Sequence, residues 1–223
     1  MEQNETPALS PSKQIAKVLF EVKAVQLNTE VFYKYVSGIL SPIYVDNRRT
    51  ISFPGPRKLI VQEFVRLLRE SVGVAPGDIV GGVATGGVPW AAWVANELDL
   101  PLIYVRPSVK DRGMHKQVEG VMEQGQRVIV VEDLITTGLS SLNAVETIRS
   151  LGGVVETVAA IFSYDSPASI MRFKNAAVSK AALTNLNAIL EVAQESKLLN
   201  PAQRQIVQEW MGTTLATWGM EGL

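Results

Sequence analysis

The sequence predicts an α/β protein with a parallel β-sheet flanked by helices. The main observation is an alternation of short apolar segments with helically spaced segments over residues 78–162, which is the pattern of successive βαβ units. Hydrophobic residues make up 47% of the 223 residues, so the chain can bury a sizeable core. Its longest apolar runs have the length of strands, well short of the roughly 18 residues of a membrane helix. We therefore expect no membrane span.

Two helices and a short extended segment precede the alternation. Helical spacing of apolar residues predicts the first helix over residues 13–27. Residues 41–46 (SPIYVD) are predicted to be extended, with Pro42 restricting the backbone at their start. A second amphipathic helix is expected to begin near Pro56 and to carry one apolar face formed by Ile60, Phe64, Leu67 and Leu68.

The alternation then supplies strands and helices in turn. Right-handed crossovers between the strands would place helices on both faces of the sheet. The C-terminal region is predicted to be helical, with one helix after the candidate N-cap Thr184 and one over residues 201–210 after the cap Asn200. Strands are predicted over residues 78–83, 102–105, 127–131 and 154–162, and helices over residues 86–98 and 141–151, the latter ended by Gly152 and Gly153.

Composition argues against several classes of function. The 21 Lys and Arg residues nearly balance the 22 Asp and Glu residues, which argues against a general nucleic-acid binder. The chain has no cysteine and a single histidine, His115. Disulfides and cysteine zinc sites are therefore excluded, and there is little room for a Ser-His-Asp triad or a multi-histidine metal site. Any metal is expected to be a hard cation held by oxygens.

The N-terminal residues suggest where the protein works. Residues 1–12 are polar and acidic, with no basic start and no apolar run. They do not have the pattern of a targeting segment. We expect a mobile tail at residues 1–12, a single folded unit over residues 13–223, and a cytoplasmic location.

The most informative loop is residues 132–140 (EDLITTGLS), which follows the apolar run VIVV. Ligands of parallel α/β sheets bind beyond the carboxyl ends of the strands. Small and hydroxylated residues at a helix start expose N–H groups and so form a phosphate cradle. The two acids beside it could accept hydrogen bonds from sugar hydroxyls, which would suit a ribose phosphate. The alternative is a loop with an ordinary Thr or Ser helix cap.

Two further loops lie at the same predicted edge. Residues 84–87 (ATGG) are small enough for a ligand to approach the backbone, but they do not match a P-loop and can equally form a tight turn. Residues 106–120 (RPSVKDRGMHKQVEG) form a long polar connection rich in cations. Such a connection is either a lid that closes over a pyrophosphate or an ordinary solvated loop.

These segments together resemble a known family. Residues 128–140 (VIVVEDLITTGLS) resemble the phosphoribosyl-pyrophosphate (PRPP) motif of the type I phosphoribosyltransferases. YVRPSVKDRG with the following QVEG resembles the flexible catalytic loop of the orotate phosphoribosyltransferase family, and SGILSPIYVDNR resembles its N-terminal hood. The resemblance implies a type I phosphoribosyltransferase-like sheet with a small hood at about residues 13–55, a core at about 56–165 and C-terminal helices at about 166–223.

The resemblance also implies a reaction and a set of site residues. Orotate and PRPP would give orotidine 5′-monophosphate and pyrophosphate in pyrimidine biosynthesis, with Mg²⁺ held mainly by PRPP and water rather than by side chains. A homodimer is implied, in which the loop of one subunit reaches the neighbouring site. The implied catalytic residues are Lys110, Arg106 and Asp111; the PRPP-binding residues are Arg106, Lys110, Arg112, Glu132, Asp133, Leu134, Ile135, Thr136, Thr137, Gly138, Leu139 and Ser140; and Thr136 would contact orotate.

Some positions depart from the family pattern. Pro107 stands where many members have a second loop lysine, and Arg112 where the family usually has histidine, so His115 is a candidate replacement. Gly86 and Ser166 stand where some members have substrate-binding Lys and Arg residues. Two alternatives therefore stay open: a phosphoribosyltransferase for another base, and a PRPP- or nucleotide-binding regulator with little activity.

Overall fold

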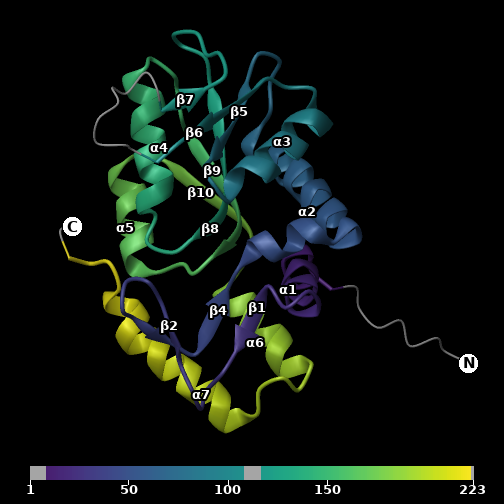
Figure 1. Ribbon diagram of the computed structural model, residues 1–223, viewed down its shortest axis with the longest axis vertical. Helices are drawn as coiled ribbons and strands as arrows, with labels where there is room; N and C mark the ends of the chain where they lie inside the picture. Colours follow the sequence, from purple (N-terminus) through teal and green to yellow (C-terminus); the bar gives the residue numbers. More distant parts are fainter. Residues whose placement is uncertain (1–8, 108–116, 222–223) are drawn as a thin grey trace, which may run out of the picture.

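A six-stranded sheet forms the centre of the protein (Figure 1). The computed structural model describes residues 9–107 and 117–221. The strands lie in the order β10-β9-β8-β5-β6-β7, and all neighbours are parallel except the pair β6 and β7. The predicted class, a largely parallel sheet flanked by helices, is therefore confirmed. The strands are β5 Ile79–Val83, β6 Leu102–Val105, β7 Val118–Glu119, β8 Val128–Ile135, β9 Thr157–Ser163 and β10 Ser179–Asn185.

Helices cover both faces of this sheet, and each face has its own hydrophobic core. In β8, Ile129 and Val131 belong to the core formed with α1, α2, α3 and α6, whereas Val128 and Val130 belong to the core formed with α4 and α5. Successive strand residues point to opposite faces, so a strand buried on both sides needs an uninterrupted apolar run. The helices are α1 Pro11–Glu21, α2 Pro54–Leu67, α3 Gly87–Leu98, α4 Leu139–Ser150, α5 Pro167–Asn175 and α6 Leu186–Glu195.

Two small antiparallel sheets lie beyond one end of the main sheet, beside α7 (Figure 1). The indole Nε1 of Trp210, at the end of α7, donates to the carbonyl of Leu40 at 2.8 Å, so α7 is attached to the smaller of these sheets. No helix within residues 9–107 and 117–221 is long and apolar enough to cross a bilayer. The remaining elements are β1 Val25–Leu27 paired with β4 Ile43–Val45, β2 Tyr33–Lys34 paired with β3 Leu40–Ser41, α7 Pro201–Trp210, a 3-10 turn Asn47–Ser52, and π-helical turns Leu68–Val72 and Met211–Leu215.

The first predicted helix is wrong in its second half. α1 begins after Ser10, whose hydroxyl accepts from the Lys13 N–H, and it ends at Glu21. Lys23 then adopts the left-handed region with φ +56° and turns the chain. Residues 25–27 form β1, because pairing with β4 buries Val25 in the same core that the end of α1 reaches. Apolar spacing alone does not distinguish one long helix from a shorter helix that is followed by a strand.

The region after β9 also differs from the prediction, which missed both α5 and β10. β10 has the sequence SKAALTN, and it lacks the valine and isoleucine that mark most strands. The cap of α6 is Asn185 rather than Thr184, because the Asn185 side chain accepts from the Ala188 N–H. The Thr184 hydroxyl instead accepts from Ser12 of α1 at 3.2 Å, so α1 packs directly on β10.

Candidate active site

The sheet topology places a crevice between the ends of β5 and β8. From β5 the chain passes through α3 to β6 on one side, whereas β8, on the other side of β5, leads through α4 and α5 to β9 and β10. A reversal of this kind opens a ligand crevice at the carboxyl ends of the strands. A cavity of about 590 Å³ lies there, lined by residues 45–48, the turn after β5, the end of β8, Thr136 and Ser140.

The two acids of the motif lie inside β8 rather than after it, which corrects the predicted strand end at residue 131. Glu132 is only 4% exposed. Its Oε2 accepts from the hydroxyls of Ser140 at 3.3 Å and Ser141 at 3.4 Å, and its Oε1 accepts from the Asp133 N–H at 3.1 Å. The start of α4 therefore fixes the Glu132 carboxylate at the cavity wall.

The Asp133 carboxylate lies against the turn after β5 and close to the Glu132 carboxylate. A Cβ atom at Gly86 would lie 2.4 Å from the Asp133 carboxyl carbon, and one at Gly87 would lie 2.4 Å from the Val131 carbonyl oxygen. Both glycines are therefore needed for this close approach. The space that a side chain at position 86 would need is filled by the Asp133 carboxylate.

Burial makes both acids hard to ionise. Removal from water raises the pKa of Glu132 well above its usual range, and repulsion from the Asp133 carboxylate adds to this. Burial also raises the pKa of Asp133, although its hydrogen bond with Glu132 and, more weakly, the nearby Arg48 guanidinium oppose the shift. A site with two such carboxylates favours ligands that donate hydrogen bonds or bring positive charge.

The residues after β8 form a turn at residues 136–138, the TTG turn, that leads into α4. The N-cap of α4 is Gly138, with φ +82°, and no side chain caps the helix. The ordinary Thr or Ser cap considered from the sequence is therefore not present. Ser140, in the first turn of α4, lines the cavity, so a helix N-terminus without a side-chain cap among the described residues lies beside it. Such an arrangement binds phosphate in many proteins.

Residues after β4 complete the cavity, and the sequence patterns did not single them out. The Asn47 side-chain Nδ2 donates to the Asp133 carbonyl at 2.6 Å, while its buried Oδ1 has no partner within the described residues. Arg48 Nε donates to Asp46 Oδ1 at 2.6 Å. The only sequence signal for these residues was their place in the segment SGILSPIYVDNR. Nothing in the local sequence indicates that Asn47 contacts Asp133, which lies 86 positions later in the chain.

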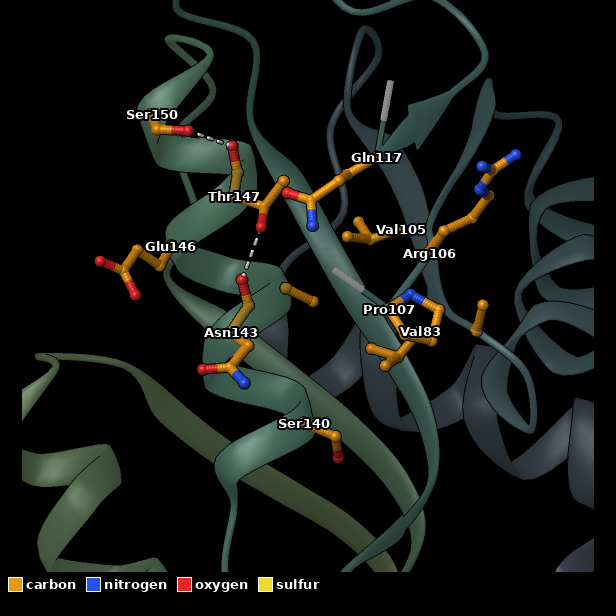
Figure 2. Close-up of a pocket in the computed structure, with 12 residues that line it drawn as sticks. Val83, Val105, Arg106, Pro107, Gln117, Ser140, Asn143, Glu146, Thr147 and Ser150 are labelled. Carbon is orange, nitrogen blue, oxygen red and sulfur yellow. Dashed lines mark hydrogen bonds between the residues drawn. The ribbon is translucent and has the colours of Figure 1, made fainter. Parts of the chain in front are cut away.

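A second cavity of about 640 Å³ adjoins the first at Ser140. Figure 2 shows Thr147 of α4 lying toward Gln117 in this cavity. Arg106 lines it, but the guanidinium points away from α4, and Nη1 donates to Glu119 Oε1 at 2.8 Å. The structure thus places Arg106 at the rim, in an ion pair, and not beside the acids. Of the other predicted loop residues, Lys110, Asp111, Arg112 and His115 lie outside the described residues.

Comparison with known proteins agrees with this geometry. The family model for the phosphoribosyl transferase domain matches residues 56–179. The orotate phosphoribosyltransferase of Coxiella burnetii is 42% identical over 91% of this chain and 96% of its own length, and that of Listeria monocytogenes is 40% identical over the same shares. The crystal structure of orotate phosphoribosyltransferase from Aeropyrum pernix superposes with a TM-score of 0.72 at 31% identity, over 83% of this chain and 99% of that one.

The sheet, the buried acid pair and the uncapped start of α4 define a type I phosphoribosyltransferase. Within that class, the chain belongs to the orotate phosphoribosyltransferase family.

Proposed function

We propose that PRPP and orotate bind in the cavity between β5 and β8 and react there. The chain is an orotate phosphoribosyltransferase of pyrimidine biosynthesis, which transfers the 5-phosphoribosyl group from PRPP to orotate. The observation that supports this placement best is the buried pair Glu132 and Asp133 beside the uncapped N-terminus of α4. A sugar phosphate has both the hydroxyl donors and the anion that these two features require.

The two acids are assigned to the ribose. Their carboxylates accept hydrogen bonds from the 2′- and 3′-hydroxyls. In the reaction, orotate N1 gives its proton to the Asp111 carboxylate and forms a bond to C1′, while the bond from C1′ to the pyrophosphate oxygen breaks and its electron pair leaves with pyrophosphate. Positive charge develops on the ring, and the buried negative charge of Glu132 and Asp133 stabilises it more strongly than it stabilises the neutral sugar.

The TTG turn, with the flanking residues of the motif, is assigned to the 5′-phosphate. The N–H groups at residues 137–140 and the hydroxyls of Thr136, Thr137 and Ser140 supply the donors, with Leu134, Ile135 and Leu139 contributing backbone. Thr136 lines the cavity, and we assign it the contact with orotate. The helix dipole of α4 adds to the attraction for the phosphate.

The cations of the long loop are assigned to the leaving group. Arg106, Lys110 and Arg112 stabilise the charge that develops on pyrophosphate, and Asp111 is assigned to proton handling. Arg106 must first leave Glu119. Both side chains of that pair are at least one-third exposed, so separating them costs little. We assign the protein a homodimer in which the loop serves the neighbouring site, so that a partly exposed cation such as Arg106 takes part in catalysis.

The donors of the site suit Mg²⁺. The cavity offers carboxylate and hydroxyl oxygens, the ligands a hard cation prefers. The cation would enter with PRPP and would be held mainly by the oxygens of PRPP and water. Glu132 and Asp133 line the same cavity, so a nearby cation would favour their ionised forms. When bound, the cation neutralises part of the pyrophosphate charge and so makes it a better leaving group.

We also propose that the protein works in the cytoplasm, with the division into hood, core and C-terminal helices given above.

The proposal is tested by mixing the protein with orotate, PRPP and Mg²⁺ and following the loss of orotate absorbance. Parallel reactions contain uracil or hypoxanthine. Lys110→Ala should abolish rapid turnover, whereas Lys58→Ala, a change of the same kind at an exposed position on α2, should not alter it. Turnover of another base but not of orotate, or PRPP binding without any turnover, would contradict the proposal in favour of the two alternatives.

A further inference from the structure

The TTG turn is held from behind by α5. The Ser166 hydroxyl, at the start of α5, donates to the Thr136 carbonyl at 2.7 Å. Arg172 Nη1, in the last turn of α5, donates to the Thr137 carbonyl at 3.1 Å. The Phe173 ring closes off the same side, since a Cβ atom at Gly138 would lie 2.8 Å from its Cε2. Two consecutive peptide groups of the turn are thus fixed by one helix.

Fixing these carbonyls also fixes the donors on the other side of the turn. In a planar trans peptide the C=O and the following N–H point in opposite directions. Holding the Thr136 oxygen therefore directs the Thr137 N–H away from α5, and holding the Thr137 oxygen directs the Gly138 N–H the same way. Donors that are aimed before the ligand arrives lose less entropy when they bind it.

Arg172 is itself held by a distant part of the chain. Its Nη2 donates to the Gly219 carbonyl at 2.6 Å, and Figure 1 shows the segment after α7 running beside α5. Gly219 has φ +76°, and a Cβ atom there would lie 2.6 Å from Thr137 Cγ2. The neighbouring Trp218 stacks on Tyr35 with 5.2 Å between ring centroids. Aromatic packing thus anchors the segment that orients Arg172.

We propose that Arg172, held by the Gly219 carbonyl, is a positioning residue that sets the affinity of the TTG turn for the 5′-phosphate of the substrate. The inference rests on the proposed function, which assigns this turn to that phosphate. Arg172 acts through the Thr137 carbonyl and the Gly138 N–H. It takes no part in bond breaking, so it contributes to binding and not to the chemical step.

The test compares two ligands by calorimetry. Ribose 5-phosphate carries the phosphate assigned to the TTG turn together with the ribose hydroxyls, and inorganic pyrophosphate carries only the leaving group. Arg172→Met should weaken ribose 5-phosphate binding by roughly 10- to 100-fold, the range for a hydrogen bond to a charged group. Pyrophosphate affinity should stay within about twofold. In turnover, the KM for PRPP should rise while kcat at saturating PRPP changes little, which is the signature of lost binding alone.

The matched control is Arg149→Met. Arg149 likewise donates to two backbone carbonyls, those of Ala176 and Val155, but it lies at the far end of α4. Arg149→Met should therefore leave the affinities for ribose 5-phosphate and pyrophosphate unchanged. Arg172→Lys keeps the charge but has no planar fork to serve two carbonyls, so it should lie between wild type and Arg172→Met. Gly219→Ala should weaken ribose 5-phosphate selectively, because its methyl group meets Thr137.

Equal ribose 5-phosphate affinity in wild type and Arg172→Met would overturn the inference. A parallel loss of both ligands would also overturn it, since it would show general loosening of the fold. If the wild-type protein bound no ribose 5-phosphate, the assignment of the turn in the proposed function would itself fail, and this result is read from the wild type without any variant.

Discussion

Gly86→Ala isolates the contact between the turn after β5 and the Asp133 carboxylate. Gly86 has ordinary helical angles, φ −67° and ψ −35°, so alanine brings no backbone strain and the effect is purely steric. The new Cβ would lie 2.4 Å from the Asp133 carboxyl carbon, whereas ordinary contacts begin at 3.4 Å. The carboxylate must therefore move by about 1 Å.

The magnitudes for stability and activity differ. Asp133 can yield by rotating its side chain, at a cost of roughly 0.5–1.5 kcal/mol for an off-rotamer angle. In a chain of this size each kcal/mol lowers Tm by about 2–4 °C, so we expect a fall of only a few degrees. A displacement of about 1 Å in a group that holds substrate can cost on the order of 10²-fold in kcat/KM.

The assay is orotate consumption at varied PRPP, with thermal melting on the same preparations. The control is Gly55→Ala, because a Cβ atom at Gly55 meets nothing within 4 Å, and it should leave kcat/KM unchanged. Wild-type kcat/KM in Gly86→Ala would refute the reasoning, since it would mean that Asp133 can shift without loss to the reaction. A large fall in Tm would refute it as well, by showing that the contact supports the fold.

Three further predictions follow from the described contacts. In wild type, the raised pKa of Glu132 means that the folded chain holds this proton more tightly than the unfolded chain, so this source of stability is lost as pH rises from near 4.5 through the raised pKa. The Tm of Glu132→Gln relative to wild type should therefore increase between pH 4 and pH 8, with activity falling at least about tenfold; a difference independent of pH would contradict this. Glu119→Gln frees Arg106, so the KM for PRPP should fall, and urea unfolding should change by less than about 1 kcal/mol; a rise in KM would count against the role of Arg106. Trp90 is fully buried, so Trp90→Ala should cost about 3–5 kcal/mol in urea unfolding, and a loss below 1 kcal/mol would show that this core tolerates a void.

The sequence was most informative where local pattern and tertiary role coincide. The apolar run VIVV predicted β8 because both faces of that strand are buried, and the acids that follow it could be placed at a sheet edge. β10 was missed because an alanine-rich strand carries no such pattern and is held by pairing with β9. β1 was missed because its valine and leucine also fit a continued helix.

The site residues divide in the same way, into those that the local sequence predicts and those that only the fold brings together. Glu132, Asp133 and the TTG turn lie in one continuous segment, so their proximity needed no knowledge of the fold. Asn47 and Arg172 reach that segment from other elements, and only the assembled sheet brings them together. The requirement for glycine at position 86 is likewise invisible in the sequence, since it depends on where the Asp133 carboxylate lies.

The packing of α1 on β10 also constrains how the protein can form on the ribosome. Ser12 and Thr184 are separated by 172 positions, so α1 emerges long before the strand it covers has been made. At about 5–20 residues per second, synthesis of that interval takes roughly 10–35 s. During this time α1 lacks the strand on which it packs, and its apolar face must remain available. Final closure of this core is therefore a late event in biosynthesis, and the interval before it is when chaperone binding would be most useful.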